Sequence, residues 1–242
     1  MWQDALLSFS YDRPHGATTW DCGIPTSAAL PGQYTFIDLM YSLLRVVIGF
    51  STDPEVHNVI APTPASVQHY IDRLATLRHD ALSEDSTCDM LERLTIRIHT
   101  GYLISQMYRF ILRRPDNLDV GGQQEHEYTV ACLETSADVV HAFVDMHSLS
   151  HAVVRSWAFV HNALSCALLL GLLPDALKRQ EVRELLRKMI GCLESIMEDT
   201  SGKSYAKSLA VLKEMYEARV EEEGVHTPDP EALRDRYIWF HR

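Results

Sequence analysis

The sequence has few cysteines, and their arrangement does not suit cross-linking. Five occur among 242 residues, namely Cys22, Cys88, Cys132, Cys166 and Cys192. Their odd number and the absence of a CxxC pair argue against a disulfide framework and against a structural zinc site. We predict reduced thiols, and we expect Cys132, Cys166 and Cys192 to be buried as small hydrophobic residues on apolar helix faces.

Positive charge is also scarce. The chain has 22 Lys and Arg residues against 33 Asp and Glu residues, which gives a net charge of -11. Proteins that hold a nucleic-acid backbone do so mainly through Lys and Arg side chains that neutralise phosphates. The composition therefore predicts no direct contact of this chain with nucleic acid, and none with an anionic membrane surface.

Membrane spans, leader sequences and common catalytic motifs are missing as well. Residues 1–10 have neither a basic start nor a long apolar run. The most apolar stretch, 157–173, is interrupted by His161 and Asn162 and is shorter than the ~20 residues that a span requires. No HExxH pattern, Walker loop, nucleophile elbow or dinucleotide fingerprint occurs. The sequence thus identifies no catalytic residue and no metal ligand, leaves cofactor-binding residues unassigned, and predicts no cofactor in this chain.

Helical periodicity is what the sequence does contain. Apolar residues recur at i, i+3, i+4 and i+7, and each proline falls in a loop or at the boundary of a periodic segment. No alternation typical of a strand is present. We predict an all-α fold of layered helices. The expected helices are 1–10, 34–50, 64–82, 88–112, 125–146, 157–173, 179–197 and 204–222.

Two of these segments are predicted to organise the rest. The stretch 157–173 is apolar on nearly every face, so we predict a buried central helix enclosed by its neighbours. The longest segment, 88–112, has two apolar faces and should contact helices on both sides. We expect Thr63 to cap the helix that begins at Pro64, and Ser148 or Ser150 to cap the central helix.

Twelve histidines raise the question of metal binding or acid–base chemistry. His147 and His151 have the i, i+4 spacing of helical metal ligands, but the serines between them predict a break in the helix. We therefore interpret them as surface or capping residues. His141 and Asp145 have the spacing of an oriented imidazole, and we interpret them as an ordinary surface pair.

The ends of two segments carry charged residues with alternative interpretations. Arg113 and Arg114 place positive charge at the negative end of the dipole of the longest helix. The alternative is that they bind a phosphate or carboxylate ligand. The tail 225–242 interleaves acidic residues with aromatic ones such as Tyr237 and Trp239. It is either a partner-binding activation segment or a terminal helix docked on its own domain.

Four stretches, in their order and spacing, resemble a known family. Trp2 to Pro14 contains Trp-Gln-Asp followed by Ser-Tyr-Asp-Arg-Pro, and Ile98 to Pro115 is a long helical segment ending in Arg-Pro. Cys132 to Ala137 reads Cys-Leu-Glu-Thr-Ser-Ala, and 157–173 is a late tryptophan followed by an apolar helix. Together they resemble the fungal-specific transcription factor domain, the middle homology region of zinc-cluster regulators.

The resemblance implies a regulatory domain that acts in the nucleus, contacts other transcription-regulatory proteins and, in some members, senses a small molecule. It leaves homodimerisation open. The family's zinc cluster and its upstream helices are absent here. We therefore expect residues 1–224 to be the C-terminal part of such a domain, followed by the tail 225–242. We also expect an uncovered apolar surface beside Trp2, Leu6 and Phe9.

Three interpretations of the function follow. In the first, the regulatory domain contains a helix-lined ligand pocket, with Met107, Tyr108 and Phe159 among its candidate lining residues. In the second, the chain is an enzyme, such as a lyase or cyclase, on a helical scaffold. His99, Tyr102 and Glu134 are its candidate catalytic residues. In the third, the chain is an inert fragment of a longer regulator.

Overall fold

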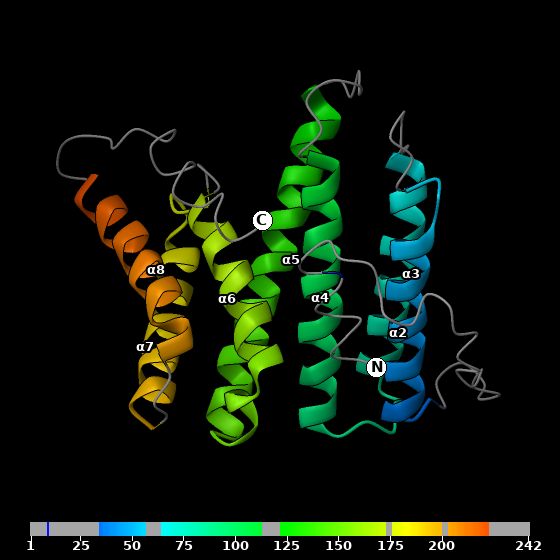
Figure 1. The fold of residues 1–242 in the computed structure, drawn as a ribbon, viewed down its shortest axis with the longest axis horizontal. Helices are drawn as coiled ribbons and strands as arrows, with labels where there is room; N and C mark the ends of the chain where they lie inside the picture. Colours follow the sequence, from blue (N-terminus) through cyan, green and yellow to red (C-terminus); the bar gives the residue numbers. More distant parts are fainter. Residues whose placement is uncertain are drawn as a thin grey trace.

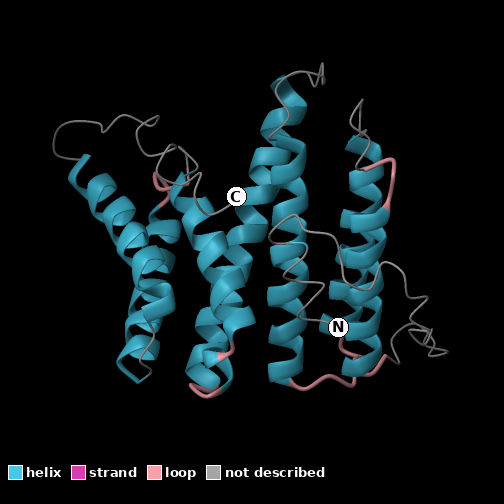
Figure 2. Cartoon of the chain, in the orientation of Figure 1, coloured by secondary structure: helices cyan, strands magenta, loops and turns pink. Residues whose placement is uncertain are grey.

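The computed structural model describes residues 9, 34–56, 64–112, 122–172, 176–199 and 203–222. Within these residues no strand occurs, and the helices pack against one another (Figures 1 and 2). The predicted all-α class is therefore confirmed. The helices are α2 (Phe36–Thr52), α3 (Pro64–Leu82), α4 (Met90–Leu112), α5 (Gly122–Leu149), η1 (Val153–Arg155), α6 (Trp157–Leu172), α7 (Gln180–Asp199) and α8 (Lys203–Glu222).

The helices stand side by side, and successive ones run in opposite directions (Figure 1). The α7–α8 pair lies at one end of the row and the α2–α3 pair at the other, with α4, α5 and α6 between them. Helix α6 packs against α4, α5, α7 and α8. Its enclosure, predicted from its apolar composition, is confirmed.

Helix α4 shares the central position with α6. It packs against α2 and α3 on one side and against α5 and α6 on the other, as its two apolar faces predict. Every residue from 98 to 105 is buried, which is the longest such run among the described residues. A helix buried on all sides must place its polar residues inside the protein, and α4 carries several there.

Reciprocal side-chain caps fix where two helices begin. The Asp38 N–H donates to Thr35 Oγ1 at 3.3 Å, and the Thr35 N–H donates to the Asp38 carboxylate at 3.0 Å. Asp89 and Glu92 form the same pair of bonds at the start of α4, at 2.8 and 3.0 Å. Because these bonds satisfy backbone N–H groups that have no helical partner, the sequence defines both starts locally. Helix α4 consequently begins after Asp89 rather than at Cys88.

The predicted cap of α6 is wrong. Helix α5 continues to Leu149, and the Ser148 hydroxyl donates to the Val144 carbonyl one turn back, at 3.0 Å. A serine bonded in this way is accommodated inside a helix instead of ending it. The carbonyl of Ser156 instead accepts from the N–H groups of Phe159 and Val160, at 3.1 and 3.3 Å. Thr63, the predicted cap of α3, lies outside the described residues.

The core confirms the expectation for the cysteines. Cys132, Cys166 and Cys192 are buried free thiols. Phe9 packs partly buried against the core, with its ring 5.5 Å from that of Phe50, so the expected uncovered surface is not found at this residue. Trp2 and Leu6 lie outside the described residues, as does most of the predicted helix 1–10.

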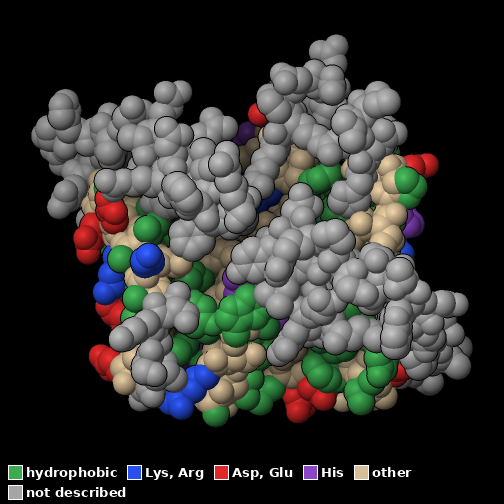
Figure 3. Space-filling model, in the orientation of Figure 1, with side chains coloured by type: hydrophobic (Ala, Val, Ile, Leu, Met, Phe, Trp, Pro, Cys, Tyr) green, Lys and Arg blue, Asp and Glu red, His purple; other side chains and the backbone are tan. Residues whose placement is uncertain are grey.

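The visible surface is mixed in character. Figure 3 shows acidic and basic side chains interspersed over α7 and α8, and hydrophobic side chains along the lower edge. None of the described helices combines the length and the hydropathy that a membrane crossing needs.

Candidate functional site: a buried polar cluster between α4, α5 and α6

Polar side chains from three helices meet inside the apolar core. On α4, a spacing of three residues places His99, Tyr102 and Ser105 along the helix. Helices α5 and α6 add side chains that reach the same region. We call the group the buried polar cluster; its members are His99, Tyr102, Ser105, Cys132, Ser136, His161, Asn162 and Cys166.

His99 and Asn162 form the centre of the cluster. The Asn162 amide nitrogen lies 2.9 Å from His99 Nδ1, which therefore accepts, and the proton of the neutral imidazole sits on Nε2. The Phe159 ring stacks on the imidazole at 5.3 Å. His99 is only 3% exposed, and its burial lowers its pKa to about 3. The imidazole is consequently neutral at physiological pH and takes no part in proton exchange with solvent.

Tyr102 and His161 link α4 to the start of α6. The Tyr102 hydroxyl lies 3.3 Å from His161 Nε2. The Trp157 indole stacks on the same imidazole, with centroids 4.8 Å apart and an interplanar angle of 16°. Burial lowers the pKa of His161 to about 4. Because Trp157 and His161 are only half-buried, this end of the buried polar cluster approaches the surface.

Two thiols form the other end of the cluster. The Cys166 thiol lies 3.5 Å from the Ser105 hydroxyl, and the Cys132 thiol donates to the Ser105 carbonyl at 3.6 Å. Burial raises the pKa of Cys132 to about 11 and that of Cys166 to about 12. A thiol must be ionised to act as a nucleophile or a metal ligand, so these two behave as packing residues at neutral pH.

The buried polar cluster has unused hydrogen-bonding capacity. Asn162 is fully buried, and its Oδ1 atom has no hydrogen-bond partner. Each such buried group costs about 1–3 kcal/mol relative to a satisfied one. Asn162 Oδ1 can only accept, so a donor group placed beside it would recover that energy.

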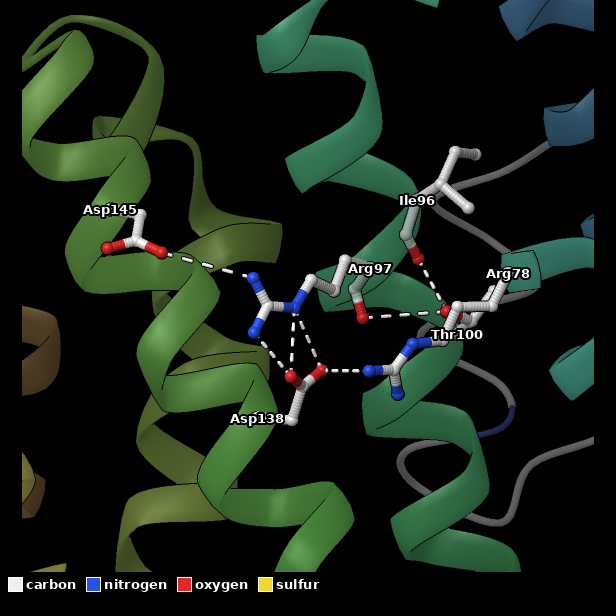
Figure 4. Close-up of polar contacts among 6 residues, drawn as sticks. All are labelled: Arg78, Ile96, Arg97, Thr100, Asp138 and Asp145. Atoms are coloured by element: carbon white, nitrogen blue, oxygen red, sulfur yellow. Dashed lines mark hydrogen bonds and ion pairs between the residues drawn. The ribbon is translucent and has the colours of Figure 1, made fainter. Parts of the chain in front are cut away.

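A second polar group joins α3, α4 and α5. The Asp138 carboxylate accepts from Arg97 Nε at 2.9 and 3.0 Å and from Arg78 on the opposite side (Figure 4). The Arg97 and Asp138 side chains are 25% and 21% exposed. These hydrogen bonds raise the pKa of Arg97. With one carboxylate shared by two guanidinium groups, the arrangement holds helices together and leaves no free acid or base for catalysis.

The two histidine-containing pairs that the sequence suggests lie in different surroundings in the structure. The predicted helix break between His147 and His151 is confirmed, because α5 ends at Leu149, but the two rings still lie together, with centroids 4.3 Å apart. His141 and Asp145 are both exposed, and Asp145 lies 3.9 Å from Arg97 Nη1. The described part of the chain contains no group of three or more potential metal-ligating side chains.

The candidate catalytic residues do not form one accessible group. His99 and Tyr102 are 3% and 2% exposed, whereas Glu134 lies on the exposed face of α5. A substrate in solvent therefore reaches the carboxylate but not the other two side chains.

The three candidate pocket residues also differ in their burial. Met107 and Phe159 are core residues, and the half-buried Tyr108 packs beside Tyr128 of α5. Arg113, Arg114 and the tail 225–242 lie outside the described residues.

The buried polar cluster coincides with the segments that carry the family resemblance. Residues 98–112 lie in α4, residues 132–137 in α5 and residues 157–172 in α6, and these three helices pack against one another. The remaining segment, 2–14, lies outside the described residues except for Phe9. In comparisons with known proteins, no family model, no curated protein and no solved structure matches this chain.

Proposed function

We propose that this chain is the regulatory domain of a fungal transcription factor, without a DNA-binding zinc cluster of its own, acting in the nucleus through other regulatory proteins. The observation that supports the proposal is the coincidence just described. The three helical segments that resemble the family are those that enclose the buried polar cluster. The regulatory function of the family would then depend on the interface between α4, α5 and α6.

The composition of this interface favours a switching role over a purely structural one. A well-packed apolar interface of the same volume would be at least as stable, because buried polar groups lose their hydration. Here Asn162 is fully buried and its Oδ1 atom remains without a partner. An interface that is not optimised for stability is one that an effector can shift with a modest binding energy.

A small-molecule effector is the simplest input. Because Asn162 is fully buried, a ligand that donates a hydrogen bond to its Oδ1 atom must bind an arrangement in which α4 and α6 have moved apart, and so shifts the population towards that arrangement. Helix α6 also packs against α7 and α8. A change at the buried polar cluster would therefore alter the outer surface of the α7–α8 pair, and a partner protein can bind that surface.

A reporter assay tests the proposal. The chain is fused to a heterologous DNA-binding domain in a fungal cell that carries a matching reporter gene. A coupling energy in the usual range of 1–3 kcal/mol predicts a change in transcription of about fivefold or more, relative to the DNA-binding domain alone. An unchanged reporter level, with the fusion present in the nucleus, would contradict the proposal.

A further inference from the structure

The end of α5 carries a pair of histidines that the buried polar cluster does not include. His147 lies in the last turn of α5 and is half-buried, and His151 follows in the exposed turn before η1. The Ser150 N–H donates to the Met146 carbonyl at 2.9 Å, so helical hydrogen bonding extends past Leu149. The two imidazoles are therefore held on one side, one turn apart.

The separation of the rings is close to that of a shared metal ion. Their centroids are 4.3 Å apart and their planes are inclined at 64°. Two imidazoles bound to one ion at bond lengths of about 2.0–2.1 Å, with a bond angle near 90–109°, have centroids about 4.5–5 Å apart. The centroids therefore need to separate by only a few tenths of an ångström, and rotation of the two side chains must direct one nitrogen of each ring at the ion.

A ring nitrogen of this pair lacks a competing partner. His147 Nε2 is shielded from solvent and makes no hydrogen bond. His151 is exposed, so an ion in solvent can reach its imidazole first. Imidazole nitrogen is a preferred ligand of divalent zinc, copper and nickel.

We propose that His147 and His151 form a binding site for a divalent transition-metal ion of this class, with water in the remaining coordination positions. The described residues supply no third side chain of the usual ligand types at this place. The bound ion would tie the end of α5 to the turn that leads through η1 into α6. This site is independent of the proposed transcriptional role, because it depends only on the geometry of the pair.

Titration of the purified chain with Zn²⁺, and separately with Ni²⁺, tests the site. In nitrogen-15 NMR spectra, we expect the imidazole signals of His147 and His151 to shift on addition of Zn²⁺, and the thermal unfolding midpoint to rise. His151→Ala removes an exposed side chain and should fold normally. We expect it to weaken metal binding at this site at least about tenfold and to abolish the rise in the unfolding midpoint.

Two further variants complete the experiment. His147→Gln should have the same effect as His151→Ala, while preserving a polar side chain of similar size. His141→Ala removes an exposed histidine from the same helix and should leave the metal response unchanged. The proposal is overturned if the wild-type signals do not move at about 1 mM Zn²⁺, which saturates any site of micromolar affinity. It is also overturned if His151→Ala and His147→Gln respond like the wild-type chain.

Discussion

Gly101 sets the distance between α4 and α5. A Cβ atom at this position would lie 2.6 Å from Cγ2 of the buried Val139, closer than side chains approach one another. Val139 is β-branched and its χ1 rotamer is restricted in a helix, so it cannot easily turn away. We expect Gly101→Ala to lower the free energy of unfolding by about 1–3 kcal/mol, measured by urea denaturation.

Gly191 provides the matched control on α7. It is exposed, and a Cβ atom there would meet nothing within 4 Å. Gly191→Ala should raise the free energy of unfolding by up to about 1 kcal/mol, because alanine favours the helix. If both substitutions stabilised the protein, the close approach of α4 and α5 at Gly101 would be refuted.

The Asp138 carboxylate joins α3, α4 and α5. Asp138→Asn removes the negative charge and one of the two acceptor oxygens that Arg78 and Arg97 share. Hydrogen bonds to charged groups, discounted for partial exposure, predict a loss of about 1–2 kcal/mol in urea unfolding. Asp145→Asn is the control, because Asp145 is 59% exposed and lies 3.9 Å from Arg97. We expect it to cost less than about 0.5 kcal/mol; equal losses would argue against a special role for Asp138.

At the scale of the helices, α4 and α6 are joined through neutral imidazoles. His99 and His161 have pKa values of about 3 and 4 in the folded protein, below the ordinary value of 6.5. The unfolded chain therefore binds more protons below pH 6.5. Stability is fully present above this pH and is lost as the pH falls towards the folded pKa values.

This difference in proton binding predicts that the free energy of unfolding falls as the pH is lowered. Each of the two histidines should lower the free energy of unfolding by at most about 1.4 kcal/mol per pH unit once the pH is below about 6. His161→Gln should remove part of the slope and leave the part that comes from His99 and from His147, whose pKa is also lowered by burial. Urea denaturation between about pH 7 and 5.5 is the measurement, since carboxylates contribute little in that range. A flat profile for the wild-type chain would show that the imidazoles take up protons in the folded protein as readily as in the unfolded chain, and would contradict this prediction.

Most of the helices were predictable because their signals are local. Periodic apolar residues predict 34–50 and 157–173, and the structure has α2 at Phe36–Thr52 and α6 at Trp157–Leu172. The cap of α6 was mispredicted because a serine that ends a helix and one that bonds back to the i-4 carbonyl look alike in sequence. Ser148 belongs to the second kind.

The sequence indicates individual residues of the candidate site but not the contacts between them. His99 and Tyr102 stand out in the sequence, but their partners Asn162 and His161 lie 63 and 59 positions away. The contacts of Asp138 with Arg97 and Arg78 span 41 and 60 positions. Periodicity identifies the buried face of a helix, whereas the residue opposite it depends on how the helices pack. For the same reason, no feature of the sequence identifies Asn162 as the centre of the buried polar cluster.

For the whole molecule, the proposed ligand sensing predicts an effector bound at the buried polar cluster. Native mass spectrometry of the chain, purified from a fungal host, should reveal a co-purifying small molecule. Asn162→Leu removes the unpaired Oδ1 atom, together with the amide nitrogen that donates to His99, and keeps the branching and the number of heavy atoms of the side chain, so the additional mass should disappear in that variant. The same bound mass on wild type and variant would place the molecule elsewhere, and a bare wild-type chain would argue against a retained effector.

The measurement that tests the central claim most directly is the reporter output of the fused chain with and without Asn162→Leu. Circular dichroism and protein levels first establish that both fusions are folded and equally abundant. If the buried polar cluster controls the regulatory surface, the substitution changes transcription by about fivefold or more. If wild type and variant drive the reporter to the same level, the cluster has no regulatory role.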